Sequence, residues 1–328
     1  MVGTDSAPRI EAGGTGMRRI AIFLGALLGL SALGLKAETR EVTLTASSIS
    51  WEIAPGQSIA AYAYNGTVPG PELRFRTGDS VRITLVNDLP EPTTIHWHGV
   101  PVPNGMDGVP DVSAPSVAPG GRFTYQFTAP APGTYWYHPH FDSAAQIARG
   151  LYGLLIVDPA EGPSPNIQSE VSLVIGEYGM GNRTMALPTR GTGGGMGGGG
   201  MGGSGMGGSG MGGSGMGAMG GELLINGKTG PAIPDLRVRR GDRVLFRMVN
   251  TGNMVHPMHV HGMHWTVTAT DGFDLPAPYR KDTLPLDAGE RYDAVLDADN
   301  PGIWMIHCHN LMHAGDGGTG LSFRLVVE

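Results

Sequence analysis

The chain has 328 residues, a formal net charge of −7, 55 glycines and a single cysteine, and 16% of its residues are charged. This length fits two domains of ordinary size. No basic tract is present, which argues against a nucleic-acid partner. One cysteine cannot form an intrachain disulfide, so Cys308 must matter through its chemistry or its packing.

The N-terminal residues read as a leader. From Met17 the chain has a basic start, an apolar run from Ile20 to about Leu35, and a small residue before Glu38. This pattern predicts an export signal at 17–37, with residues 1–16 an upstream extension or tag, and a periplasmic or secreted protein. The run is short for a spanning helix, so we expect no stable membrane anchor. An arginine pair at the start leaves the twin-arginine route open.

After the leader, short β-rich stretches alternate with turn residues. Examples are residues 80–86, 122–127, 153–157 and 170–176. No long stretch has helical periodicity, so the sequence predicts an all-β fold built from sandwiches.

The chain also repeats itself. LRFRTGDSVRITLVN at 73–87 matches LRVRRGDRVLFRMVN at 236–250, and two histidines follow each copy at the same spacing. A second match joins YWYHPH at 135–140 to WMIHCH at 304–309. The repeat predicts two homologous β domains, which we delimit as 38–160 and 161–328.

A glycine- and methionine-rich segment, residues 191–221, interrupts the second domain. It repeats Met-Gly-Gly-Ser-Gly, a composition that predicts a flexible insertion. Thioether sulfur prefers Cu(I), so the segment could capture cuprous ions. An inert, expanded repeat is the equally open alternative.

The differences between the two copies locate one candidate metal site. His256 falls opposite Thr93, Cys308 opposite Pro139, and His313 opposite Ala144. Only the second copy therefore has two imidazoles and a thiolate, a set that suits a one-electron copper site.

The remaining candidate ligands form four His-x-His pairs. They are His96 and His98, His138 and His140, His259 and His261, and His307 and His309. Eight imidazoles suit a cluster of several metal ions where two domains face each other. In an extended strand, His307 and His309 point away from Cys308, so one peptide can contact two different metal centres.

These motifs, IHWHG at 95–99, YWYHPH at 135–140, HPMHVHG at 256–262 and HCHNLMH at 307–313, resemble those of the multicopper oxidases. The resemblance is to the two-domain, laccase-like kind with the mononuclear site in the second domain. It implies cupredoxin-like Greek-key β-sandwich domains and four coppers per functional unit: one type 1, one type 2 and two type 3. Type 1 copper would be held by His256, Cys308 and His313, type 2 by His96 and His259, and type 3 by His98, His138, His140, His261, His307 and His309.

The resemblance also implies the reaction. One-electron oxidation of phenols, anilines or Cu(I) would be coupled to reduction of dioxygen to water, with electrons passing through Cys308. Asp107 resembles the acidic residue that relays protons to the cluster, although it could instead be a turn aspartate before Gly108. Small two-domain relatives form homotrimers with intersubunit trinuclear clusters, and we expect the same here. A cluster at an interface within one chain is the alternative that the sequence leaves open.

Two positions depart from the family pattern. The usual axial position, five residues after His313, is Gly318; we expect Leu321 to be the non-coordinating axial neighbour, with Met312 the alternative. His264 is offset from the usual position, and we interpret it as a structural or surface histidine.

Two other functions remain open from the sequence. One is a periplasmic copper-sequestering or resistance protein whose methionine segment binds Cu(I). The other is a copper nitrite reductase, against which the His-Cys-His run and the four His-x-His pairs argue.

Overall fold

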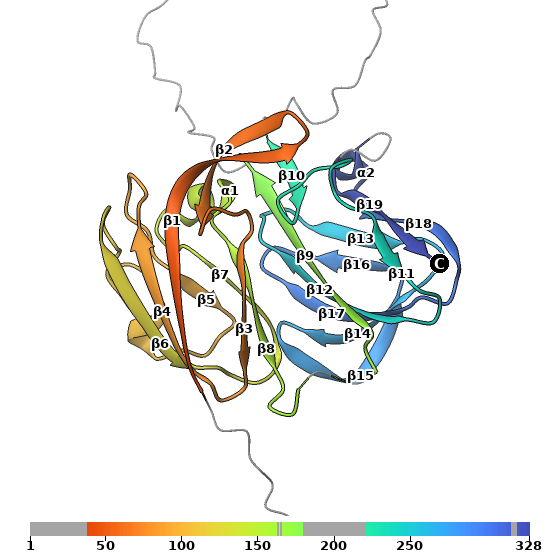
Figure 1. The fold of residues 1–328 in the computed structure, drawn as a ribbon, viewed down its shortest axis with the longest axis horizontal. Coiled ribbons are helices and arrows are strands. Elements are labelled where there is room, and N and C mark those ends of the chain that lie inside the picture. Colours follow the sequence, from red (N-terminus) through yellow and green to blue (C-terminus); the bar gives the residue numbers. More distant parts are fainter. Residues whose placement is uncertain (1–37, 163, 165, 180–220, 316–319) are drawn as a thin grey trace, which may run out of the picture. The chain divides into compact units, whose positions relative to one another are not determined.

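The computed structural model describes residues 38–162, 164, 166–179, 221–315 and 320–328, and these residues build two β-sandwiches (Figure 1). Over these residues the α-helices are two short ones, α1 (Ser143–Ala148) and α2 (Leu311–Ala314), together with one 3-10 turn, η1 (Asn104–Met106). The predicted all-β fold is therefore confirmed. Within the same ranges, no helix is both long and apolar enough to cross a membrane. The leader and all but the last residue of the methionine-rich segment lie outside the described residues.

The first sandwich consists of two four-stranded sheets. Its outer sheet has the order β2-β1-β4-β6, and its inner sheet the order β3-β8-β7-β5. The outer strands are β1 (Thr39–Ala54), β2 (Gln57–Tyr64), β4 (Ser80–Asn87) and β6 (Arg122–Thr128). The inner strands are β3 (Gly70–Arg76), β5 (His96–His98), β7 (Gly133–His138) and β8 (Gly153–Asp158). Strands β4, β6 and β8 confirm three of the predicted β stretches.

The second sandwich has larger sheets. Its inner sheet has the order β10-β9-β12-β17-β14-β15, and its outer sheet the order β11-β19-β18-β13-β16. The inner strands are β9 (Ser169–Tyr178), β10 (Glu222–Ile225), β12 (Arg243–Asn250), β14 (Trp265–Thr270), β15 (Phe273–Lys281) and β17 (Arg291–Asp297). The outer strands are β11 (Leu236–Val238), β13 (His256–Val260), β16 (Thr283–Leu286), β18 (Gly302–Cys308) and β19 (Ser322–Val327). Strand β9 confirms the stretch predicted at 170–176.

Side-chain alternation determines how the sheets stack. In β7, Tyr135 and Tyr137 point into the core of the first sandwich, while Trp136 points the other way and packs near Val174 and Val249 of the second inner sheet. The opposite face of that sheet packs against the second outer sheet around Phe246 and its neighbours. The second inner sheet therefore lies between the first inner sheet and the second outer sheet.

The internal repeat is visible in the hydrogen bonds. The side chain of Asn65 bonds the backbone of Thr43 and Thr45 in β1, and Asn226 bonds Ser172 and Val174 in β9 in the same way. The amides of Asn87 and Asn250 likewise each donate to two carbonyls of their own sandwich. The two copies therefore share details of their turns as well as their strand order.

A buried polar network joins the two sandwiches. The guanidinium of Arg247 in β12 donates to Asp293 of β17 and to the hydroxyl of Thr134 in β7, each at 2.9 Å. It also donates to Glu170 of β9 at 3.1 Å. Burial raises the pKa of Asp293, and the charge of Arg247 opposes that shift. Arg247 is thus the cation that compensates a buried carboxylate at the contact between the sandwiches.

Replacing Arg247 by Ala should destabilise the fold strongly, because Asp293 would remain buried without its cation. Breaking one partner of a buried ion pair costs about 3–5 kcal/mol. Arg243→Ala is the matched control: it removes a 3.0 Å pair with Asp297 whose side chains are 45% and 59% exposed, and it should cost less than about 1 kcal/mol. Urea unfolding measures both. Equal losses would contradict the structural importance of the network.

Candidate metal centres

Three groups of side chains bring metal-ligating atoms together. In each group these atoms lie within 4.8 Å of one another. The groups are His256, Cys308 and His313; His96, His98 and His138; and His259, His261 and His307. Together with His140 and His309, they include every histidine and cysteine that the sequence predicted as a ligand.

The thiolate group is the most enclosed of the three. The Sγ of Cys308 lies 3.8 Å from Nδ1 of His256 and 3.7 Å from Nδ1 of His313. His256 and Cys308 have no exposed surface, and His313 is 7% exposed. His256 starts β13, Cys308 ends β18, and His313 lies in α2. One soft sulfur and two imidazole nitrogens around one point form the donor set of a mononuclear copper site.

Leu321 and Met312, the two candidate axial neighbours, lie in different surroundings. Leu321 is fully buried, its carbonyl accepts the N–H of Cys308 at 2.9 Å, and its own N–H donates to the carbonyl of His313 at 2.9 Å. Met312 is 61% exposed, on the surface of α2. Leu321 therefore lies beside the thiolate group.

Cys308 faces the core while its neighbour faces outward. Cys308 pairs with Met258 across the β13–β18 ladder and belongs to the core of the second sandwich. His307 pairs with His259, and its ring contacts the rings of His259 and His261 on the outer face of the sheet. One strand therefore supplies ligands to both faces, as the alternation predicts.

The first histidine set lies around β5 and β7. The ring of His96 contacts His98, His138 and His140, with centroid separations of 5.2–5.9 Å. Nδ1 of His96 lies 2.9 Å from the carbonyl oxygen of Asp107 and 3.2 Å from its Oδ1. The predicted acidic residue therefore contacts this set directly.

The second set, around β13 and β18, repeats this arrangement. The ring of His259 contacts His261, His307 and His309, with centroid separations of 4.9–5.6 Å. The ring nitrogens Nε2 of His261 and His307 lie 3.0 Å apart.

Backbone acceptors orient the rings in both sets. Nδ1 of His138 donates to the carbonyl of Pro139, and Nδ1 of His307 to the carbonyl of Cys308, each at 2.9 Å. Nδ1 of His259 lies 3.0 Å from the carbonyl of Asp282. Each of these bonds leaves Nε2 with a free lone pair, which is the form that a metal requires.

The two histidine sets lie on different layers. Trp97 points into the core of the first sandwich, so His96 and His98 lie on the opposite face of the first inner sheet, which is turned toward the second sandwich. Gly289 of the second sandwich lies close to His98: a Cβ added at Gly289 would be 3.2 Å from the imidazole. The second set is on the exposed face of the second outer sheet. Among the described residues, the rings of the first histidine set contact one another, and so do the rings of the second set, but no ring of one set contacts a ring of the other. The second inner sheet separates them within one chain.

The first sandwich has hydrogen-bonded polar side chains where the second has the thiolate group. Thr93, at the position of His256, donates to the amide oxygen of Gln146 at 2.8 Å, and both residues are fully buried. The Gln146 amide nitrogen is in turn bonded to Glu91 and to the carbonyl of Pro92. This network fills the equivalent space without metal ligands.

Burial favours the neutral form of five of the candidate ligand histidines. It lowers the pKa of His138 to about 3 and, with the charge of Arg291, that of His98 to about 4. It also lowers the pKa values of His261, His307 and His313. These five rings are therefore unprotonated at neutral pH, as ligands must be.

Burial has the opposite effect on the thiol, raising the pKa of Cys308 to about 11. A thiolate in this apolar surrounding needs a cation beside it, and a bound copper ion would provide one. The donor atoms and their electrostatics thus fit the metal.

Two observations concern residues outside the ligand set. His264 is exposed, and its Nδ1 lies 3.5 Å from Arg280, as expected for a surface histidine. Glu177 was not predicted: this buried carboxylate of β9 lies 3.1 Å from Nε2 of His256. The one feature of the sequence that could have pointed to Glu177 is the comparison of the two copies, in which this acidic residue aligns with Ser48 of the first.

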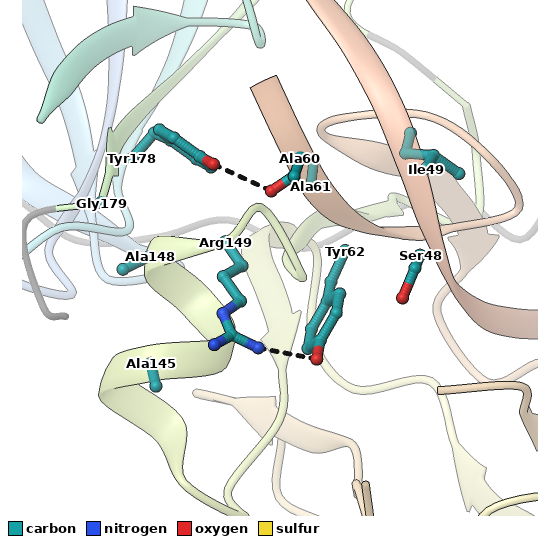
Figure 2. A pocket seen from close by; sticks show the side chains of 10 residues that line it. All are labelled: Ser48, Ile49, Ala60, Ala61, Tyr62, Ala145, Ala148, Arg149, Tyr178 and Gly179. Carbon is teal, nitrogen blue, oxygen red and sulfur yellow. Dashed lines mark hydrogen bonds between the residues drawn. The ribbon is translucent and has the colours of Figure 1, made fainter. Parts of the chain in front are cut away.

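A cavity of about 320 Å³ lies where β1, β2 and α1 of the first sandwich meet the end of β9 (Figure 2). Arg149 lies 4.8 Å from the ring centroid of Tyr62 and donates to its hydroxyl at 2.6 Å. None of the predicted ligands lines this cavity.

Comparison with known proteins identifies the family. Two family models, both described as multicopper oxidase, match residues 45–162 and 212–327. The chain therefore belongs to the multicopper oxidase family, and copper is the metal that its histidine and cysteine groups fit.

Individual relatives agree with this assignment. The multicopper oxidase MmcO of Mycobacterium tuberculosis is 32% identical over 251 residues, which are 74% of this chain and 49% of MmcO. The chain thus spans about half the length of that curated relative. The blue copper oxidase of Nitrosomonas europaea superposes with a TM-score of 0.73 at 29% identity, covering 89% of this chain and 86% of that one. The multicopper oxidase mgLAC superposes with a TM-score of 0.72 at 32% identity, covering 89% of this chain and 87% of mgLAC. The cupredoxin-like fold of both sandwiches follows from these likenesses.

The metal-free protein should lose stability as the pH falls below about 6.5. Because His98 and His138 have pKa values far below those of the unfolded chain, the unfolded chain binds more protons between about pH 6.5 and pH 4. Lowering the pH from 7.5 to 5.5 should cost about 1 kcal/mol for each of these two histidines. Urea unfolding at both pH values measures this.

His138→Gln should reduce that pH dependence, whereas the exposed His264→Gln should leave it unchanged. An identical pH dependence in the wild-type protein and in His138→Gln would contradict the buried, neutral state of His138.

Proposed function

We propose that the protein is a copper-dependent oxidase that couples one-electron oxidation of a reducing substrate to four-electron reduction of dioxygen to water. The observation that carries this proposal is the position of Cys308. Its sulfur belongs to a buried thiolate–diimidazole group, while the neighbouring His307 belongs to a histidine set on the opposite face of the same strand.

The ligand roles follow the family pattern. Type 1 copper is held by His256, Cys308 and His313, and type 2 copper by His96 and His259. The type 3 pair is held by His98, His138, His140, His261, His307 and His309. When bound, these coppers supply one-electron redox chemistry at the first site and multi-electron reduction of dioxygen at the cluster.

The protein contributes the electron path. Cys308 is bonded through its own backbone to His307 and His309, and the side chains of Cys308 and His307 point to opposite faces of the outer sheet. This covalent link connects the buried thiolate group to the histidine set. The first copy has Pro139 at this place, so electron entry belongs to the second sandwich.

Asp107 serves the proton supply. Its carbonyl and carboxylate both contact Nδ1 of His96, and its side chain is 34% exposed. One residue thus touches both a cluster ligand and solvent, the arrangement that a proton relay needs. Leu321 is buried beside the thiolate group and has no donor atom, and a non-coordinating side chain at this place would favour a higher reduction potential of a bound type 1 copper.

The active assembly is a homotrimer with intersubunit clusters. One chain carries both histidine sets but separates them by a sheet, so a complete cluster requires a second copy. The outer face of β18 supports this: next to His307 it presents Ile303, 66% exposed, and Met305, 38% exposed. Apolar side chains beside an incomplete metal site are suited to an interface, and repeated head-to-tail contacts can close a ring.

The reductant is a phenol, an aniline or Cu(I), and the protein acts in the periplasm or outside the cell. This rests on the family and on the predicted leader at 1–37. The domains are 38–160 and 161–328, with the insertion at 191–221. A copper-storage protein would bind the metal without turnover, and a nitrite reductase would not need the eight cluster histidines.

Cys308→Ser tests the division of ligands. A hydroxyl cannot replace the soft thiolate, so the blue colour should disappear and oxidation of external donors should fall to background. The variant should lose one copper per chain and keep the others. Dioxygen uptake with Cu(I) and with a dimethoxyphenol, together with copper content, measures these effects.

His264→Gln is the control and should behave as wild type. Copper binding by the wild-type protein without dioxygen uptake from either donor would favour storage, and loss of all copper from Cys308→Ser would contradict the ligand roles.

A further inference from the structure

The ring of His256 lies between the thiolate group and a buried carboxylate. Its Nδ1 lies 3.8 Å from Sγ of Cys308, and its Nε2 lies 3.1 Å from Oε1 of Glu177. Glu177 is 5% exposed and belongs to β9, far from the His-Cys-His run in sequence. The nitrogen that is turned away from the copper site therefore has its own acidic partner.

The surroundings of Glu177 stabilise an ionised carboxylate. Its Oε1 also accepts the backbone N–H of Met254 at 2.7 Å. The imidazole of His256 and the backbone N–H of Met254 both lie within hydrogen-bond distance of this one oxygen, so the buried carboxylate has donors in place of water. Every one of these partners is a donor, which suits an acceptor-only anion.

The loop between β12 and β13 is shaped around this carboxylate. A Cβ at Gly252 would lie 2.3 Å from Oε1 of Glu177, which is too close for any residue with a side chain to fit there without a shift. The N–H of Gly252 donates a hydrogen bond to the side-chain oxygen Oδ1 of Asn250 at 2.9 Å. A glycine at 252 therefore allows the backbone to approach the acid just before His256 begins β13.

The end of β9 is fixed to the first sandwich, so Glu177 has a defined position. Figure 2 shows the hydroxyl of Tyr178 donating to the carbonyl of Ala60, at 2.9 Å. The N–H of Gly179 donates to the carbonyl of Ala148 in α1, also at 2.9 Å. Because side chains alternate along the strand, Tyr178 points to the first sandwich while Glu177 points to His256.

A comparison of the two copies of the repeat shows that Glu177 is present only in the copy that has the thiolate group. The asparagine turns align Thr45 of β1 with Val174 of β9, and the same register aligns Ser48 with Glu177. The first copy thus has Ser48 and Thr93 where the second has Glu177 and His256. The acid and the imidazole occur together, and only in the copy with the cysteine.

We propose that Glu177 is a positioning residue for the type 1 copper site: its carboxylate accepts the Nε2–H of His256, holds the ring in the tautomer that presents Nδ1 beside Cys308, and places a buried negative charge next to the metal. This inference rests on the proposed function, in which His256 is a type 1 ligand. Outer partners of this kind fix ring orientation and increase ligand basicity.

The charge has a definite consequence for the reduction potential. A nearby anion favours the oxidised, more positive state of the metal and therefore lowers the potential. Leu321, which offers no axial donor, acts in the opposite direction. The two residues together set the driving force for accepting an electron from the substrate.

The test uses the copper-loaded, full-length protein. Glu177→Gln keeps an acceptor of nearly the same shape but removes the charge, so the blue colour should remain and the type 1 potential should become more positive. Glu177→Ala removes both, and its copper affinity at the type 1 site should fall 10- to 100-fold. Redox titration of the blue absorption and copper competition with a chelator measure these changes.

Tyr178→Phe is the matched control. It removes the hydrogen bond to Ala60 from the adjacent residue but leaves the carboxylate, so the potential should equal that of wild type even if the protein melts at a lower temperature.

Glu177→Gln with a wild-type potential would overturn the inference, and so would a shift of the same size in Tyr178→Phe. Should Glu177→Ala fail to fold, Glu177→Gln decides. A wild-type protein without blue absorption would instead refute the type 1 assignment, a failure of the proposed function that is distinguishable from a failure of this inference.

Discussion

The side-chain alternation of β18 is the constraint on which the rest of the site depends. Because Cys308 must point into the core of the second sandwich to meet His256 and His313, His307 must point to the outer face of the sheet. A β-strand gives this opposition without any special backbone geometry, whereas a helix would turn adjacent residues by only about 100°. Two centres of different chemistry can therefore share one peptide while a sheet keeps them apart.

The stacking of the sheets has a consequence for assembly. The repeat gives each sandwich a histidine set, yet the second inner sheet lies between them in one chain. The Arg247 network and the apolar contact around Trp136 hold the sandwiches in this arrangement. The same packing that stabilises the chain thus keeps the two sets on different sheets. Under the proposed function, a second copy binds at the outer face of β18 and completes the cluster.

Much of this could be predicted from the sequence, because the repeat and the His-x-His pairs encode strand positions and ligands directly. The separation of the two histidine sets could not, because it depends on which sheet faces pack together. Glu177 was also missed: its contact with His256 joins residues 79 positions apart, and a lone acidic residue carries no pattern. The sequence leaves both Leu321 and Met312 as candidate axial neighbours because the segment after His313 has an atypical length. In the structure Leu321 is buried and bonded to the backbone of Cys308 and His313, whereas Met312 is exposed.

Complementation between two inactive chains tests the central claim, that the cluster is shared between copies, most directly. His138→Ala damages the first histidine set and His261→Ala the second, while both leave the thiolate group intact, so both chains should stay blue. When the two variants are co-expressed, an interface is intact if its first histidine set comes from the His261→Ala chain and its second from the His138→Ala chain. Random mixing gives about one such interface in four, and these should restore dioxygen uptake. Mixed, blue assemblies that remain inactive would contradict the account, because they would mean that each cluster draws both sets from a single chain.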